Sequence, residues 1–149
     1  MSSCKHDHEK RTPAQMMASA RQICEEQGRR FTPLREHIFE LIAKQTAPVK
    51  AYDLLDQLKP EVGSPKPPTV YRALEFLAGL GLIHRVEALN AYIACDHSHG
   101  GHVAEFFICE KCESLQERHA NDHVECVPEG FTISRSVIEH YGVCKSCTA

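Results

Sequence analysis

The chain has 149 residues, of which 42% are hydrophobic and 25% are charged. This composition is typical of soluble globular proteins, and the length suits one compact domain or two small ones. No apolar run approaches the ~18–20 residues of a membrane span. The polar N-terminal segment also lacks the apolar core of a secretory signal. We therefore predict a cytoplasmic protein that does not enter a membrane.

Cysteine and histidine are unusually frequent, with 8 Cys and 10 His. In a reducing cytoplasm such a count indicates zinc or redox chemistry rather than disulfides. Charge is unevenly divided: residues 1–95 hold 13 Lys and Arg against 11 Asp and Glu, whereas residues 96–149 hold 4 against 9. The first part is therefore weakly compatible with nucleic-acid binding. Ordinary scatter of charge explains this division equally well.

Residues 1–12 are polar and show no periodicity, so we predict a mobile tail. Apolar residues then recur at helical spacing in four segments, which predicts four helices. Threonine followed by proline favours a helix start, glycine favours a helix end, and the Gly- and Pro-rich residues 63–68 predict a loop. The segments are Met16–Ile23, followed by Gly28; Leu34–Ile42, preceded by Thr32 and Pro33; Ala51–Leu58, followed by Pro60; and 69–80, with Gly79 and Gly81 at its end.

Two short strand-like runs come next, Leu82–Glu87 and Ala91–Cys95, with residues 88–90 as a hairpin connection. Helices followed by a hairpin are typical of a winged helix-turn-helix, in which 69–80 is the second helix of the turn. Its outward side presents Thr69, Tyr71, Arg72 and Glu75. Arginine can bind guanine and tyrosine can contact a phosphate or a base edge. A solvated helix surface is the other interpretation, and this segment alone does not decide between them.

The second part alternates short elements after a His- and Gly-rich linker at residues 96–102. We predict strands at Glu105–Cys109, Ser114–Arg118 and Phe131–Ile138, and a helix at 119–128. About 50 residues with few aliphatic side chains cannot bury a large core, so this part needs a covalent or metal cross-link, a partner chain, or both.

Two Cys-x-x-Cys pairs can supply that cross-link. Cys109 with Cys112 and Cys144 with Cys147 are separated by 31 intervening residues, and each pair can present two thiolates to one ion. Together they form the closed tetrahedral shell of structural Zn²⁺, whose binding contributes on the order of 10 kcal/mol to folding. A thiol–disulfide switch that uses the same cysteines is the alternative.

Further potential ligands surround the linker. Cys95 and Glu117, together with two histidines from among His84, His99 and His102, would form a mixed sulfur, nitrogen and oxygen site. Zn²⁺ accepts such a set, whereas a thiolate disfavours Mg²⁺, Ca²⁺ and Mn²⁺. By spacing alone, surface histidines and a small buried cysteine explain these residues as well.

Four motifs taken together resemble the ferric uptake regulator family, and most closely its zinc uptake regulator branch, from about residue 15 to 148. They are Arg30-Phe-Thr-Pro-Leu-Arg35, Pro68-Thr-Val-Tyr-Arg-Ala-Leu74, Cys109-x-x-Cys112 and Glu139-His-Tyr-Gly-x-Cys144-x-x-Cys147. The resemblance implies a metal-dependent transcriptional repressor and no enzyme. It implies an α+β homodimer with an N-terminal winged helix and a small α/β dimerisation domain, which binds inverted-repeat operators when metal-loaded.

The resemblance also implies a role for individual residues and two Zn²⁺ per subunit. Tyr52 and Arg72 match the DNA-contacting pair, to which the helix pattern adds Thr69 and Tyr71. The structural zinc ligands are Cys109, Cys112, Cys144 and Cys147, and the regulatory zinc ligands are His84, Cys95, His102 and Glu117. The resulting organisation is a tail at 1–12, a winged-helix domain at 13–95, a hinge at 96–102 and a dimerisation domain at 103–149.

Departures from the iron- and peroxide-sensing branches favour zinc. Residues 45–50 lack the sensor histidine common in those branches, and Cys95 replaces their carboxylate. A thiolate favours Zn²⁺ and is easily oxidised beside Fe²⁺. A third family metal site takes a histidine where this chain has Ser136; His119 and His123, spaced i and i+4 on the expected helix, could replace it.

We therefore predict a zinc-responsive repressor of zinc uptake genes, without a small-molecule substrate. An iron- or peroxide-responsive regulator of the same family is the alternative. A zinc-ribbon interaction module without a DNA role, and a hydrolytic zinc enzyme, are less compatible with the motifs. The enzyme would need an open metal position, and the chain has no HExxH motif. Cys24 is expected in the core, and Cys126 is unassigned.

Overall fold

The computed structural model describes residues 11–62, 65–95, 103–120, 126–133 and 136–148. The chain forms two compact units, Met1–Ser98 and His99–Ala149. Residues 1–10 of the expected tail and all of the expected hinge, 96–102, lie outside the described residues. Across the described ranges, every helix is too short or too polar to cross a membrane.

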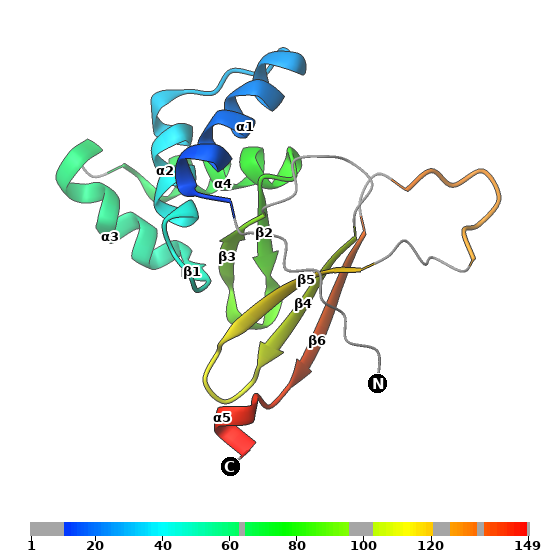
Figure 1. Cartoon of the computed structure of the whole chain (residues 1–149). Helices are drawn as coiled ribbons and strands as arrows, with labels where there is room; N and C mark the ends of the chain where they lie inside the picture. Colours follow the sequence, from blue (N-terminus) through cyan, green and yellow to red (C-terminus); the bar gives the residue numbers. More distant parts are fainter. Residues whose placement is uncertain (1–10, 63–64, 96–102, 121–125, 134–135, 149) are drawn as a thin grey trace. The chain divides into compact units, whose positions relative to one another are not determined.

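The first unit contains four helices and a small sheet (Figure 1). Its elements are α1 (Pro13–Glu26), α2 (Pro33–Ala43), β1 (Val49–Lys50), α3 (Ala51–Val62), α4 (Pro67–Gly79), β2 (Ile83–Val86), the 3₁₀ turn η1 (Glu87–Leu89) and β3 (Ala91–Ala94). The sheet has the order β1-β3-β2, with both pairs antiparallel. The predicted four helices and hairpin are confirmed.

The end of α3 and the start of α4 differ from the prediction, both at prolines, and β1 was not predicted. α3 continues through Pro60 to Val62, although proline lacks the backbone N–H that one helical hydrogen bond needs. α4 begins at Pro67, two residues before the expected start, because prolines are favoured in a first turn, where N–H groups have no helical acceptor. β1 has only two residues, too few to give a period in the sequence.

Side-chain caps begin the first two helices. Thr12 Oγ1 accepts from the backbone N of Gln15 at 3.2 Å, and Gln15 Oε1 accepts from the backbone N of Thr12 at 2.9 Å. This reciprocal pair is a capping box. Thr32 caps α2 with a single hydrogen bond, in which its Oγ1 accepts from the backbone N of Arg35 at 3.4 Å. Arg11 and Thr12, which were predicted to belong to the tail, thus directly precede an ordered helix start.

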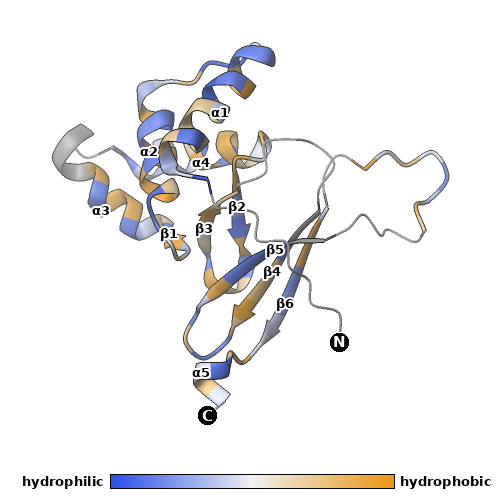
Figure 2. Cartoon of the chain, viewed as in Figure 1, coloured by the Kyte–Doolittle hydropathy of each residue, from blue (hydrophilic) through white to orange (hydrophobic). Residues whose placement is uncertain are grey.

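The core of the first unit is formed by one apolar stripe from each helix, with Tyr92, Ile83 and Val49 of the sheet. Figure 2 shows apolar and polar residues alternating along α1, α2 and α4, as expected for helices with one buried side. Fully buried members include Ile38, Leu54, Leu58, Val70, Leu74 and Leu77. Cys24 is 2% exposed and belongs to this core, as expected.

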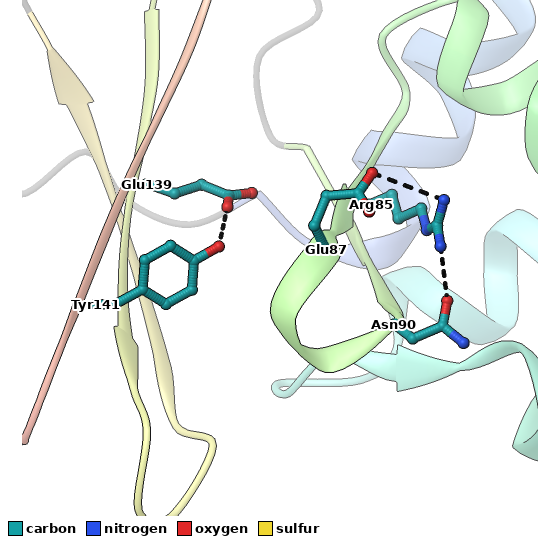
Figure 3. A network of polar contacts seen from close by, with 5 residues as sticks. All are labelled: Arg85, Glu87, Asn90, Glu139 and Tyr141. Carbon is teal, nitrogen blue, oxygen red and sulfur yellow. Dashed lines mark hydrogen bonds and ion pairs between the residues drawn. The ribbon is translucent and has the colours of Figure 1, made fainter.

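The wing turns through η1 and Asn90, whose φ of 46° is left-handed. Asparagine tolerates that conformation better than most residues. Arg85 Nη2 donates to Asn90 Oδ1 at 3.0 Å, and Arg85 Nη1 lies 3.6 Å from Glu87 Oε1 (Figure 3). Arg85 therefore connects the strand before the turn to the turn itself.

The second unit contains β4 (Val103–Cys109), β5 (Leu115–Ala120), β6 (Val137–Gly142) and the short helix α5 (Lys145–Thr148). The sheet order is β5-β4-β6, with β4 antiparallel to β5 and parallel to β6. Phe106 and Ile108 of β4 are buried, whereas Phe107, Ile138 and Tyr141 are exposed. Tyr141 donates a hydrogen bond to Glu139 on the same strand (Figure 3).

Two predictions for this unit are wrong. The helix expected at 119–128 is not formed: His119 and Ala120 end β5, 126–128 are not helical, and 121–125 lie outside the described residues. The last strand is 137–142 rather than Phe131–Ile138, since 131–133 are irregular. His119 therefore lies on a strand, and His123 lies outside the described residues, so no helical spacing supports a third metal site there.

Candidate metal centre and DNA-binding surface

Three elements converge at the two Cys-x-x-Cys pairs. Cys109 ends β4, Cys112 lies in the turn to β5, and Cys144 and Cys147 enclose the start of α5. The parallel register places Cys109 opposite Gly142, and the backbone N of Glu110 donates to Gly142 O at 2.8 Å. Strand pairing thus brings together cysteines that are far apart in the sequence.

The four sulfur atoms form a compact cluster, with all four within 4.8 Å of one another. Cys112 Sγ and Cys144 Sγ are 3.7 Å apart. A tetrahedral zinc ion with Zn–S bonds of about 2.3 Å requires sulfur separations of about 3.8 Å. The cluster therefore fits Zn²⁺, and in the described residues it is the single group of three or more potential ligands this close together.

Hydrogen bonds give the thiols different proton affinities. The backbone N of Cys144 donates to Cys109 Sγ at 3.3 Å and, with other backbone donors, lowers the pKa of Cys109 to about 6. Ser114 Oγ lies 3.2 Å from Cys112 Sγ, and this hydrogen bond lowers the pKa of Cys112. Bonding to Cys144 and Cys112 raises the pKa of Cys147 to about 12. A divalent cation replaces such thiol protons when it binds.

Two residues around this cluster, Ser114 and Lys111, were not predicted from the sequence. The Lys111 ammonium donates to the carbonyl O of Cys147 at 3.4 Å, which links the two Cys-x-x-Cys turns. Ser114 follows Cys112 by two residues, and a hydroxyl so near a metal-binding turn is a signal that could have identified it.

Among the other cysteines, burial raises the pKa of Cys24, and Cys126 is exposed.

The residues expected to bind a regulatory zinc are divided between the two units. In the first unit, His84 lies on β2 opposite Ile93, and Cys95 directly follows β3; both are half-buried. In the second unit, Glu117 lies on β5 opposite Phe106 and is half-buried. His102 lies outside the described residues. The structure therefore describes three of the four expected ligands, each within its own unit.

The expected DNA-binding residues lie on exposed helix surface of the first unit. α4 buries Val70, Ala73, Leu74, Phe76 and Leu77, and the opposite side presents Thr69, Tyr71, Arg72 and Glu75 to solvent. Tyr71 is 45% exposed, and Tyr52, in the first turn of α3, is 75% exposed. Both tyrosine rings are therefore accessible to a binding partner.

Comparison with known proteins extends over nearly the whole chain. The sequence model of the Ferric uptake regulator family matches residues 26–141. The chain is 37% identical to the zinc uptake regulation protein of Escherichia coli K12, over 93% of this chain and 85% of that protein. It is 28% identical to the peroxide operon regulator of Bacillus subtilis, over 91% and 95%.

A solved structure gives the same result. A zinc uptake regulator complexed with zinc and DNA superimposes with a TM-score of 0.77 at 35% identity, covering 93% of this chain and 97% of that one. The family motifs, the helix order and the four-cysteine cluster therefore agree with one another. This chain belongs to the ferric uptake regulator family, and its predicted α+β fold is confirmed.

Proposed function

We propose that the protein is a cytoplasmic, zinc-responsive transcriptional repressor that binds inverted-repeat operator DNA as a zinc-loaded homodimer and controls zinc uptake genes. The observation that carries the proposal is the similarity, over most of both chains, to a zinc uptake regulation protein. The four-cysteine cluster supports it independently, since its sulfur spacing fits zinc.

The first of two Zn²⁺ per subunit is structural. Cys109, Cys112, Cys144 and Cys147 hold it and leave no open position for a substrate or water. When bound, the ion supplies a cross-link between the ends of β4 and β6. Because few apolar side chains are buried among the described residues of this unit, that cross-link also stabilises the α/β domain, 103–149, through which the homodimer forms.

The second Zn²⁺ is regulatory, with His84, Cys95, His102 and Glu117 as ligands. One thiolate, two imidazoles and one carboxylate form a set that zinc accepts and that disfavours harder divalent cations. These ligands belong to the winged-helix domain, 13–95, the hinge, 96–102, and the dimerisation domain. When they share one ion they restrict the hinge, and zinc affinity and DNA affinity become reciprocally coupled.

In this proposal, α4 and the start of α3 make the contacts with DNA. Arg72 has the planar N–H edge that recognises guanine, and Tyr52, Thr69 and Tyr71 offer hydroxyl groups for bases or phosphates. In a homodimer, two copies of α4 enter successive major grooves, about 34 Å apart or a multiple of that. An inverted-repeat operator follows from the two-fold symmetry.

The test is a Co²⁺ titration of the full-length protein that retains its structural zinc, with Cys95→Ser beside the wild type. A sulfur-containing tetrahedral site gives intense visible bands and thiolate-to-cobalt charge transfer in the wild type, and both are absent in Cys95→Ser. Zinc-dependent DNA affinity is expected to disappear with them. A second Co²⁺ ion whose visible spectrum is the same in the wild type and in Cys95→Ser would contradict the zinc-responsive assignment.

An iron- or peroxide-responsive regulator is the second candidate, favoured by the similarity to a peroxide operon regulator. The same titration distinguishes the two candidate functions, because Co²⁺ in a nitrogen- and oxygen-rich site with a higher coordination number gives only weak visible bands. Fe²⁺ would then replace Zn²⁺ as the ion that promotes DNA binding.

A further inference from the structure

Two guanidinium groups lie over one aromatic ring of α4. Arg35 Cζ lies 3.7 Å from the centroid of the Phe76 ring, and Arg29 Cζ lies 5.3 Å from it. Phe76 is 9% exposed and Arg35 is half-buried, so their contact forms largely away from water, where cation–π attraction is strongest, whereas Arg29 covers the ring from the exposed side. Arg29 lies between α1 and α2, and Arg35 lies in the first turn of α2. Both arginines therefore connect this region to α4.

Stacking uses the flat face of a guanidinium and leaves its N–H edge available. Arg35 uses one donor within the chain, since Nη1 donates to the carbonyl O of Arg30 at 2.6 Å. Over the described part of the chain, neither Arg29 nor Arg35 forms an ion pair with a carboxylate. Arg21 differs, because its Nε lies 2.9 Å from Glu36 Oε1.

The position of the Phe76 ring on α4 places the guanidinium groups of Arg29 and Arg35 beside the proposed DNA-binding surface. Phe76 follows Arg72 by four residues, so the two are neighbours on the helix surface. Arg72 is exposed and Phe76 lies at the border between core and surface. In helix-turn-helix proteins the N-terminal residues of the second helix contact bases, while neighbouring elements follow the DNA backbone. Arg29 and Arg35 occupy such a neighbouring element.

We propose that Arg29 and Arg35, stacked on Phe76, bind DNA phosphates beside α4. The proposal rests on the proposed function, because it needs DNA as the partner. A planar guanidinium binds phosphate through two parallel hydrogen bonds, and a stacked one loses less side-chain freedom when it does so. Phosphate contacts fix register and contribute affinity without selecting a base. This pair therefore strengthens binding without changing which sequence is read.

The experiment uses zinc-loaded full-length protein and two labelled duplexes of equal length. One is selected by the wild type from a random-sequence pool, and the other is unrelated to it. Arg29→Gln and Arg35→Gln are each expected to weaken binding to both duplexes by a similar factor, about 5–10-fold. The slope of log K against log salt becomes shallower by about 1 for each phosphate that the variant no longer binds.

Two further variants make the result specific. Arg21→Gln removes an exposed arginine that already has a carboxylate partner, and it is expected to leave both affinities and the slope unchanged. Arg72→Ala removes a base-reading residue and is expected to weaken the selected duplex far more than the unrelated one. Thermal unfolding is measured for each variant. Arg29 is exposed, and its guanidinium forms no hydrogen bond within the described ranges, so Arg29→Gln keeps the test decisive if Arg35→Gln unfolds.

The outcomes separate this proposal from the function on which it rests. Suppose that Arg72→Ala lowers affinity for the selected duplex while Arg29→Gln and Arg35→Gln keep wild-type affinity and slope. The proposed phosphate contacts of Arg29 and Arg35 are then wrong, and the repressor function stands. If the zinc-loaded wild type selects no duplex, the repressor function is wrong, and the proposed phosphate contacts are wrong as well.

Discussion

At the scale of single residues, Ser114 and the backbone N of Cys144 control how easily a proton competes for the sulfur cluster. Both favour a thiolate, at Cys112 and at Cys109 respectively. The pKa of Cys109 is about 6, against an ordinary value of 9.0. Because the pKa is lowered, the stabilisation of the thiolate is fully present at pH values above the ordinary pKa of 9.0. The stabilisation is lost as the pH falls through about 6.

Ser114→Ala is therefore expected to release the structural zinc at a higher pH than the wild type does. Without the hydroxyl, the largest influence that lowers the pKa of Cys112 is lost, while the backbone hydrogen bond at residue 114 remains, so protons displace the metal more readily. Zinc release during acidification is followed with a chromogenic chelator. Ser146→Ala is the matched control, since Ser146 lies between Cys144 and Cys147 and is exposed. Identical release profiles for Ser114→Ala and the wild type would contradict this role.

At the scale of elements, the caps show how a local sequence begins a helix. Thr12→Ala removes the acceptor for the backbone N of Gln15 and breaks the capping box of α1. We expect the free energy of unfolding to fall by about 1 kcal/mol, measured by urea denaturation. Thr12→Ser is the matched control, because serine keeps the hydroxyl acceptor and is expected to preserve wild-type stability. Equal losses in both variants would show that the cap contributes nothing.

The helices were predictable because each carries a strong local pattern. The buried stripe of α4, from Val70 to Leu77, repeats at helical spacing, and Thr32 with Pro33 identifies the start of α2. Local patterns fail where a longer-range partner decides the structure. β1 exists because Val49 and Lys50 pair with Tyr92 and Ala91, which no window around residue 49 reveals.

The second unit was less predictable for the same reason. Exposed Ile138 and Tyr141 give β6 a weak alternation, so the apolar residues Phe131 and Ile133 misled the strand prediction. The four-cysteine cluster was found because its spacing is itself the signal. The hydroxyl of Ser114 and the ring contact between Arg35 and Phe76 needed the fold, since nothing in the sequence relates Arg35 to Phe76.

At the scale of the whole molecule, the two units differ in what stabilises them. The first has a large core drawn from four helices and a sheet. Among the described residues of the second, only Phe106, Ile108 and Cys109 are buried apolar side chains. Such a small core cannot by itself offset the entropy of an ordered sheet, so we expect the second unit to depend on its structural zinc, alone or together with a partner chain.

Zinc removal with a strong chelator is therefore expected to unfold the second unit while the first stays folded. Hydrogen exchange measured by mass spectrometry should show fast exchange over β4 and β6 and retained protection over α2 and α4. Returning zinc should restore protection, which excludes irreversible damage. Protection of β4 and β6 that survives complete removal of both ions would show that packing alone holds the sheet.

The parallel pairing of β4 with β6 also has a consequence for biosynthesis. Cys112 and Cys147 are 35 residues apart, so at ordinary translation rates about 2–7 s separate their addition to the chain. During that interval the winged-helix unit has its complete sequence and can fold, whereas the first thiol pair still lacks its partners. Loading of the four-cysteine site is thus expected late, after all residues of α1 to α4 have been added to the chain.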